Sequence, residues 1–143
     1  MNERERNTRQ GCPFCGVEIE GRSIAQEGSV FAVRDKYPVT PLHTLVLPRR
    51  HVADYFDLLP EERADAEALL RRLRAAILEE DPSVTGFNVG VNCGGAAGQT
   101  ILHVHIHLIP RRDGDVDNPT GGVRGVIPER MDYRPMANAG GGK

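Results

Sequence analysis

The stretch Gln99-Thr100-Ile101-Leu102-His103-Val104-His105-Ile106-His107-Leu108-Ile109-Pro110-Arg111 carries the strongest structural signal in the chain. Apolar and polar residues alternate through ILHVHIHLIP, and this period predicts a β-strand that ends at Pro110. Alternate residues of a strand share a face, so Val104, Ile106 and Leu108 are expected to point into the core. The three histidines at 103, 105 and 107 are then expected on the opposite face.

The spacing of these histidines limits the chemistry that they can support. At ~3.3 Å per residue, the backbones of His103 and His107 lie about 13 Å apart, so three rings on one straight strand cannot converge on one zinc ion. At least one imidazole is therefore free, and a neutral imidazole is a good nucleophile near neutral pH. The small residues 94–100 just before the row could bring backbone amides close to phosphate oxygens. The alternative for the histidine row is that the three half-exposed rings have no role. The alternative for residues 94–100 is a plain glycine-rich turn.

Strand signals flank one helical signal along the rest of the chain. Residues 23–28, 29–35 and 43–48 read as three short strands, and residues 86–92 as a fourth. Between them, a 3.6-residue period begins at Pro60 and ends near Asp81-Pro82, which predicts a long amphipathic helix. This order predicts an α+β fold, in which an antiparallel sheet of about five strands packs with one long helix and a short one.

The composition sets the domain count and excludes two classes of partner. A chain of 143 residues is the length of one domain, which we place at residues 12–113. Residues 1–11 are expected to form a disordered N-terminal tail. Residues 114–143 are expected to form an extended C-terminal arm that ends in a loose tail from about Ala137. A net charge of −2 argues against a nucleic-acid partner. No apolar run approaches the ~18 residues of a membrane span. The charged first ten residues do not resemble a signal peptide, so a reducing cytoplasm is the expected location.

The histidine row and its surroundings resemble the histidine triad family. The likeness includes Asp35, eight residues before His43, the strand His43–Pro48, and Asn92, seven residues before Gln99. It extends over roughly residues 12–113, while the arm resembles a microbial branch of the family.

The resemblance implies a nucleotidyl hydrolase of dinucleoside polyphosphates or nucleoside phosphoramidates. His105 would be the nucleophile and form a nucleotidyl-histidine intermediate, with the carbonyl of His103 accepting its Nδ1 proton. His107, Gln99 and Thr100 would hold phosphate oxygens. Asp35 would bind the ribose hydroxyls, Asn92 would line the substrate pocket, and the base would lie against apolar side chains near the first strands. A nucleotidyl transferase or phosphorylase, a non-catalytic nucleotide-binding protein and a metal-dependent hydrolase are the alternatives.

A second motif, Cys12-Pro13-Phe14-Cys15-Gly16, has the spacing of a zinc knuckle. A tetrahedral site needs two more ligands, and Cys93 and the histidines are the candidates; a pair of free or redox-active thiols is the alternative. The family resemblance implies that His51 and His103 complete one structural zinc site per chain. It also implies a homodimer in which each C-terminal arm lies near the partner's site.

Overall fold

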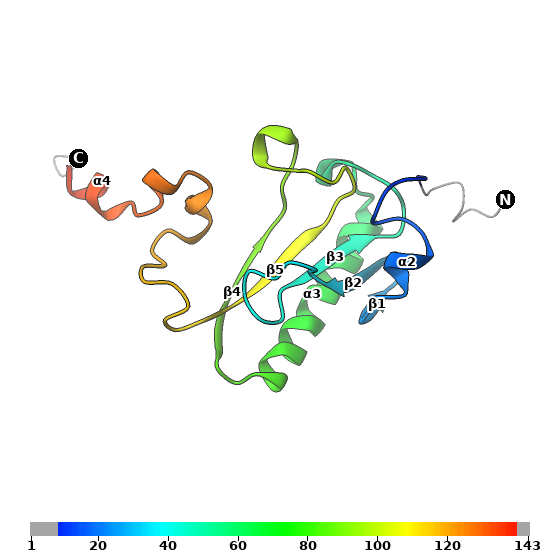
Figure 1. Ribbon diagram of the computed structural model, residues 1–143, viewed down its shortest axis with the longest axis horizontal. Coiled ribbons are helices and arrows are strands. Elements are labelled where there is room, and N and C mark those ends of the chain that lie inside the picture. Colours follow the sequence, from blue (N-terminus) through cyan, green and yellow to red (C-terminus); the bar gives the residue numbers. More distant parts are fainter. Residues whose placement is uncertain (1–8, 140–143) are drawn as a thin grey trace.

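The computed structural model describes residues 9–139 and contains one five-stranded antiparallel sheet (Figure 1). Its strands run in the order β1-β2-β3-β5-β4. Their bounds are β1 Ala25–Glu27, β2 Val30–Arg34, β3 Thr44–Pro48, β4 Val84–Gly90 and β5 Ile106–Arg112. The α+β fold class expected from the sequence is confirmed, since the sheet, one long helix and short helices are all present.

The long helix α3, Pro60–Glu80, covers one face of the sheet (Figure 1). Pro60 stands at its first turn, where a missing backbone N–H costs nothing, and Glu62 accepts the N–H of Leu59 at 2.8 Å. The residues that recur every three or four positions are buried against the sheet. This part of the core consists of Ala66, Leu69, Leu73 and Ile77 of the helix with Val30, Ala32, Val46, Ile106 and Leu108 of the strands.

The opposite face of β2 and β3 is buried by the N-terminal segment. Phe14 and Ile19, the latter on the short helix α2 (Val17–Glu20), pack against Phe31, Leu45 and Leu47. Because both faces of these two central strands are covered, they read as nearly continuous apolar runs instead of alternating patterns. The same packing brings the Cys-x-x-Cys turn onto the face of the sheet that carries the histidines.

Three sequence expectations about local structure were wrong. Strand β5 begins at Ile106, not at Ile101, because the five residues before it form an irregular turn, and it continues past Pro110 to Arg112. The C-terminal arm is not simply extended, since it contains the 3₁₀ turns η3 (Gly122–Val126) and η4 (Pro128–Arg130). The tail expected to be loose from Ala137 is helical to the end of α4, Arg134–Ala139.

The two predicted tails lie partly outside the residues that the structure describes. The predicted N-terminal tail, residues 1–11, lies outside the described residues except for its last three positions, and the final four residues of the predicted C-terminal tail lie outside them as well. Within residues 9–139, no helix has the length and apolar character needed to cross a membrane.

Candidate active site

His105 is held in one tautomer by the backbone of the preceding turn. Its Nδ1 lies 2.8 Å from the carbonyl oxygen of His103. A carbonyl can only accept a hydrogen bond, so in the neutral ring Nδ1 carries the proton and Nε2 keeps its lone pair. Phe14 contacts the ring edge-on at a centroid distance of 4.9 Å, which restricts its rotation. The ring therefore presents an unprotonated nitrogen from a fixed position.

A chain of hydrogen bonds fixes the tautomer of His107 in turn. The backbone N–H of Val39 donates to Nδ1 of His43 at 3.2 Å, so a neutral His43 carries its proton on Nε2. That Nε2 lies 2.9 Å from Nδ1 of His107 and donates to it. His107 consequently carries its own proton on Nε2. His105 thus offers a bare nitrogen, while His107, the next residue on the same face, offers an N–H.

Burial keeps the His43–His107 pair neutral. Burial, and after it the electrostatic effects of His105 and His43, lower the pKa of His107 to about 4, and Asp35 opposes the shift. Burial likewise lowers the pKa of His43, against the opposing effect of Asp35, whose Oδ2 lies 3.5 Å from Nε2 of His43. Near neutral pH both rings are uncharged, which is the state that the hydrogen-bond chain requires.

His105 and His107 open onto a cavity of about 510 Å³. One part of its wall is apolar and includes Phe14, Ile19 and Leu45. The polar residues Asp35, Asn92 and Thr100 lie on the same cavity, so the structure brings these predicted substrate contacts together with two of the three histidines. A pocket that combines an apolar part with convergent polar groups is typical of a small-molecule site.

Gln99 is placed differently from its neighbours. Its side chain is buried, and its Oε1 accepts the backbone N–H of Gly94 at 2.8 Å while its Nε2 donates to the carbonyl of Ala53 at 2.7 Å. The first bond closes the glycine-rich loop, with Gly98 in the left-handed conformation (φ 91°) that favours glycine, and the second ties the loop to the segment after β3. Gln99 is not among the residues that line the cavity, so its amide shapes the loop from behind.

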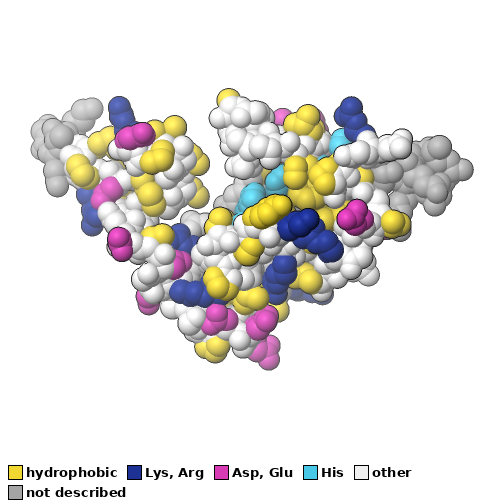
Figure 2. All heavy atoms as spheres, in the orientation of Figure 1, with side chains coloured by type: hydrophobic (Ala, Val, Ile, Leu, Met, Phe, Trp, Pro, Cys, Tyr) yellow, Lys and Arg dark blue, Asp and Glu magenta, His cyan; other side chains and the backbone are white. Residues whose placement is uncertain are grey.

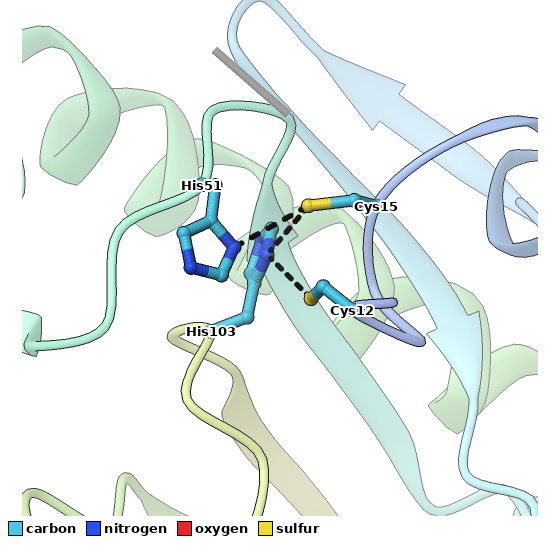
Figure 3. Close-up of side chains that lie close together, drawn as sticks. All are labelled: Cys12, Cys15, His51 and His103. Atoms are coloured by element: carbon cyan, nitrogen blue, oxygen red, sulfur yellow. Dashed lines mark hydrogen bonds between the residues drawn. The ribbon is translucent and has the colours of Figure 1, made fainter. Parts of the chain in front are cut away.

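The four predicted metal ligands Cys12, Cys15, His51 and His103 form one cluster beside the active site (Figure 3). The Nδ1 atom of His103 lies 3.5 Å from Sγ of Cys12 and 3.4 Å from Sγ of Cys15, and Nδ1 of His51 lies 3.4 Å from Sγ of Cys15. Zinc with bonds of ~2.3 Å to sulfur and ~2.0–2.1 Å to nitrogen separates tetrahedral S and N ligands by about 3.5–3.6 Å. These three sulfur–nitrogen separations fit a Cys₂His₂ zinc site, and all four ligand atoms lie within 4.8 Å of one another.

The surroundings of His103 agree with a role as a metal ligand. Its Nε2 donates to the carbonyl of Pro48 at 2.7 Å, which leaves Nδ1 unprotonated and directed at the two sulfurs. Burial lowers its pKa to about 4, so the ring is neutral. The ring is fully buried, which contradicts the sequence expectation of three histidines presented side by side; the irregular turn before Ile106 turns it toward the cysteines. Cys93, the other candidate, is not in the cluster.

Two further residues belong to the site although sequence analysis did not single them out for a role there. His43 was read only as part of a strand, and Phe14 only as a spacer within the Cys-x-x-Cys motif. Both depend on contacts between distant segments: His43 meets His107 across the β3–β5 pairing, and Phe14 meets His105 across the sheet face. The one available sequence signal was that His43 is one of only five histidines.

A sheet of this topology, with His105 and His107 facing a cavity of about 510 Å³, agrees with the resemblance to the histidine triad family. Residues 17–114 match the model of the HIT domain family, and the chain belongs to this family. An uncharacterized HIT-like protein of Mycobacterium tuberculosis is 41% identical over 108 residues, which are 73% of this chain and 74% of that protein. The AP-4-A phosphorylase of the same species is 36% identical over 115 residues, which are 78% of this chain and 58% of the enzyme.

Solved structures show the same fold. A Zn-bound histidine triad family protein from Mycobacterium smegmatis superimposes with a TM-score of 0.60 and 38% identity, over 65% of this chain and 67% of that one. A HIT family protein from Bacillus anthracis superimposes with a TM-score of 0.64 and 37% identity, over 76% of this chain and 78% of that one. The first of these shows that zinc occurs within this fold.

Proposed function

We propose that the protein is a nucleotidyl hydrolase that cleaves nucleoside phosphoramidates or dinucleoside polyphosphates through a covalent intermediate on His105. The observation that carries this proposal is the pair of fixed tautomers on one cavity: a bare Nε2 on His105 beside a protonated Nε2 on His107. A nucleophile and a hydrogen-bond donor are then in place before the substrate binds, so no reorganisation is needed during the reaction. The related AP-4-A phosphorylase supports nucleotide chemistry at this site.

In the first step, Nε2 of His105 attacks the α-phosphorus and the leaving group departs. The positive charge that develops on the imidazole is stabilised by the hydrogen bond from Nδ1 to the carbonyl of His103. His107 donates its Nε2 proton in a hydrogen bond to a phosphoryl oxygen, and Thr100, on the same cavity, supplies a further donor. In the second step, water attacks the nucleotidyl-histidine and regenerates the free imidazole.

The remaining assignments concern substrate orientation. Asp35 accepts the ribose hydroxyls, since one of its oxygens is anchored by the N–H of Tyr37 at 2.7 Å while the carboxylate lines the cavity. The base lies between Phe14, Ile19 and Leu45. Asn92 contacts the phosphate from the loop side, and Gln99, predicted to bind phosphate directly, acts by closing the loop that presents Thr100.

We further propose that Cys12, Cys15, His51 and His103 hold one structural zinc. A metal bound by four protein ligands has no open position for substrate, and its role is to tie the N-terminal segment to the turn that carries His103. This turn supplies the carbonyl that orients His105, and the Cys-x-x-Cys turn supplies Phe14. The zinc would therefore hold in place both Phe14 in the cavity wall and the carbonyl group that fixes the tautomer of His105. Reduced thiols suit the expected cytoplasmic location.

A metal-dependent hydrolysis on the active-site face is a second candidate, because Asp35, His43 and His107 also place their ligand atoms within 4.8 Å of one another. The hydrogen bond between His43 and His107 argues against it. Nε2 of His43 is protonated and Nδ1 of His107 accepts that proton, so a metal ion between the two rings would have to displace it.

Substitution of His105 tests the proposal. His105→Ala should lower kcat for adenosine 5′-phosphoramidate by orders of magnitude, while equilibrium dialysis with adenosine monophosphate shows nearly unchanged binding. A variant that retained more than about a tenth of the activity, a loss of only ~1.4 kcal/mol in barrier, would refute the assignment. Product analysis with and without added inorganic phosphate separates a hydrolase, which forms the nucleoside monophosphate in both cases, from a phosphorylase, which requires phosphate and forms the diphosphate.

A further inference from the structure

Charged side chains line one wall of the active-site cavity and have no part in the proposed mechanism. Among residues 9–139, the acidic and basic residues that line this cavity are Glu18, Arg22, Asp35 and Lys36. Asp35 is assigned to the ribose, and Lys36 follows it in the sequence. Glu18 and Arg22 belong to a different wall, formed by α2 and the turn after it. On the face drawn in Figure 2, acidic and basic side chains lie beside hydrophobic and histidine side chains, near the position of α2 in Figure 1.

We propose that Glu18 and Arg22 recognise the edge of the nucleobase and select guanine over adenine. The inference rests on the proposed function, which places the base against Phe14, Ile19 and Leu45. Glu18 and Arg22 lie on the same short segment as Ile19, and all three line the same cavity. The two charged groups therefore border the position of the base.

The backbone places these two side chains one helical turn apart. The N–H of Gly21 donates to the carbonyl of Val17 at 2.9 Å. The N–H of Arg22 donates to the carbonyl of Ile19 at 3.0 Å, so the chain goes on turning past the end of α2. Residues four apart on a helix lie on one side of it, with their Cβ atoms about 5–6 Å apart. One carboxylate and one guanidinium can thus reach neighbouring atoms on one edge of a base.

Both groups are available to a ligand. Within the described part of the chain, residues 9–139, the carboxylate of Glu18 has no hydrogen-bond or ion-pair partner, and it is not paired with Arg22. The guanidinium of Arg22 donates from Nη2 to the carbonyl of Arg34 at 2.9 Å, which anchors it to the end of β2. Its Nε and Nη1 groups have no acceptor among the same residues. A fixed donor and an unpaired acceptor therefore stand next to each other on the cavity.

Guanine is the base whose edge matches this pair. Its N1–H and 2-amino groups are adjacent donors, and the two oxygens of one carboxylate can accept from both. Its O6 and N7 are the acceptors to which arginine commonly donates. Adenine and cytosine each present one amino group beside a ring nitrogen, whose lone pair would face the carboxylate and be repelled. The same carboxylate thus attracts guanine and disfavours its competitors.

Three nucleoside phosphoramidates that differ only in the base test the inference. The probes are guanosine, inosine and adenosine 5′-phosphoramidate, with kcat/KM measured for each on the full chain. Inosine keeps N1–H and O6 of guanosine but lacks the 2-amino group. We expect kcat/KM to fall in the order guanosine, inosine, adenosine. Guanosine should exceed adenosine by at least about tenfold, which is the effect of ~1.4 kcal/mol.

Glu18→Gln should move the preference from guanine toward adenine. A glutamine amide accepts from an amino group with its oxygen and donates to a ring nitrogen, which is the pattern of adenine. The kcat/KM of guanosine 5′-phosphoramidate should fall about tenfold, while that of the adenosine compound should stay constant or rise. The matched control is Glu79→Gln, an exposed carboxylate near the end of α3 and outside the cavity lining. It should leave the ratio of the two within about twofold of the wild type.

Arg22→Met removes the donor to O6. It should lower kcat/KM for guanosine and inosine, which both carry O6, by more than for adenosine. The matched control Arg71→Met replaces an exposed arginine of α3 outside this cavity and should leave the order and the ratios of the three bases unchanged.

Binding without turnover separates this inference from the proposed function. Calorimetry with guanosine and adenosine monophosphates should give a Kd about tenfold lower for the guanosine compound. If none of the phosphoramidates is hydrolysed, the proposed function fails, and the two Kd values still test the choice of base.

Three results would overturn the inference while leaving the proposed function intact. The first is hydrolysis of the guanosine and adenosine compounds at equal kcat/KM with equal Kd values for the monophosphates, or a preference for adenosine. The second is a ratio in Glu18→Gln that equals the ratio in Glu79→Gln. The third is an equal fall for all three bases in Glu18→Gln and Arg22→Met, because these side chains would then support the cavity without reading the base.

Discussion

Replacement of His43 tests whether the tautomer of His107 is set by its neighbour. His43 is only 3% exposed, and leucine is of similar size, so His43→Leu fills the same buried space with an apolar side chain. The substitution removes the hydrogen bond of 2.9 Å from Nε2 of His43 to Nδ1 of His107. His107 can then carry its proton on Nδ1, and Nε2 no longer donates to the phosphate. His43→Gln is the matched control, because its terminal amide can still donate toward His107.

The size of the effect follows from one neutral hydrogen bond. Such a bond contributes about 0.5–1.5 kcal/mol net, and a buried partner left without it costs about 1–3 kcal/mol. A loss of ~1.4–2.7 kcal/mol in the transition state corresponds to a fall of about 10- to 100-fold in kcat/KM. We therefore expect kcat/KM to fall by about 10- to 100-fold in His43→Leu. In His43→Gln, the fall in log kcat/KM should be less than about a third of that in His43→Leu.

Steady-state kinetics and ¹⁵N NMR of the histidine rings together provide the assay. Kinetics with adenosine 5′-phosphoramidate should be measured well below the melting temperature, since His43→Leu also leaves the N–H of Val39 without its acceptor. The NMR spectrum of the wild type should show His107 protonated on Nε2, and that of His43→Leu a mixture of tautomers. Full activity in His43→Leu, equal impairment in both variants, or an unchanged tautomer would refute the reasoning.

The remaining predictions concern the metal, pH and assembly. Cys12→Ser should lower both the zinc content, measured by elemental analysis, and the melting temperature. It should also raise KM, because Phe14 loses its support, while leaving more activity than His105→Ala. The control Cys93→Ser, outside the cluster, should change none of these quantities, and a wild-type protein without zinc would disprove the site. Because the pKa of His107 falls from 6.5 to about 4 on folding, the unfolded chain binds the extra proton between these values. The free energy of unfolding should therefore fall by ~1–3 kcal/mol as pH drops from 6.5 to 4, and urea titrations should show a smaller fall in His107→Gln. Light scattering should give the mass of two chains over a wide concentration range; a monomeric mass would contradict the expected dimer.

Much of the fold could be predicted from the sequence because its signals are local. The alternation of Val104, Ile106 and Leu108, and the three- and four-residue spacing of Ala66, Leu69 and Leu73, reflect burial on one face, and these residues are buried as expected. The start of β5 could not be predicted this way. Its alternating pattern continues upstream of Ile106, but the backbone leaves the sheet there and directs His103 to the cysteines.

The parts of the site that could not be predicted depend on packing between distant segments. His43 and His107 are 64 residues apart in the sequence. Only the β3–β5 pairing brings Nε2 of His43 to 2.9 Å from Nδ1 of His107. Gln99 stands next to the histidine row, as a phosphate-binding residue would, yet its side chain bonds to Gly94 within the loop and to Ala53 in the segment after β3. Sequence proximity alone does not distinguish a side chain that faces a ligand from one that shapes the backbone behind it.

The central claim is that His105 becomes covalently nucleotidylated, and rapid acid-quench mass spectrometry tests it most directly. The protein is mixed with adenosine 5′-phosphoramidate, quenched within milliseconds and digested, and the peptide that carries residues 103–107 is fragmented. We predict an added adenylyl group on His105 that forms within the first turnover and is lost as adenosine monophosphate appears. Turnover without any adduct, or an adduct on His107 or on a residue outside the histidine row, would contradict the account.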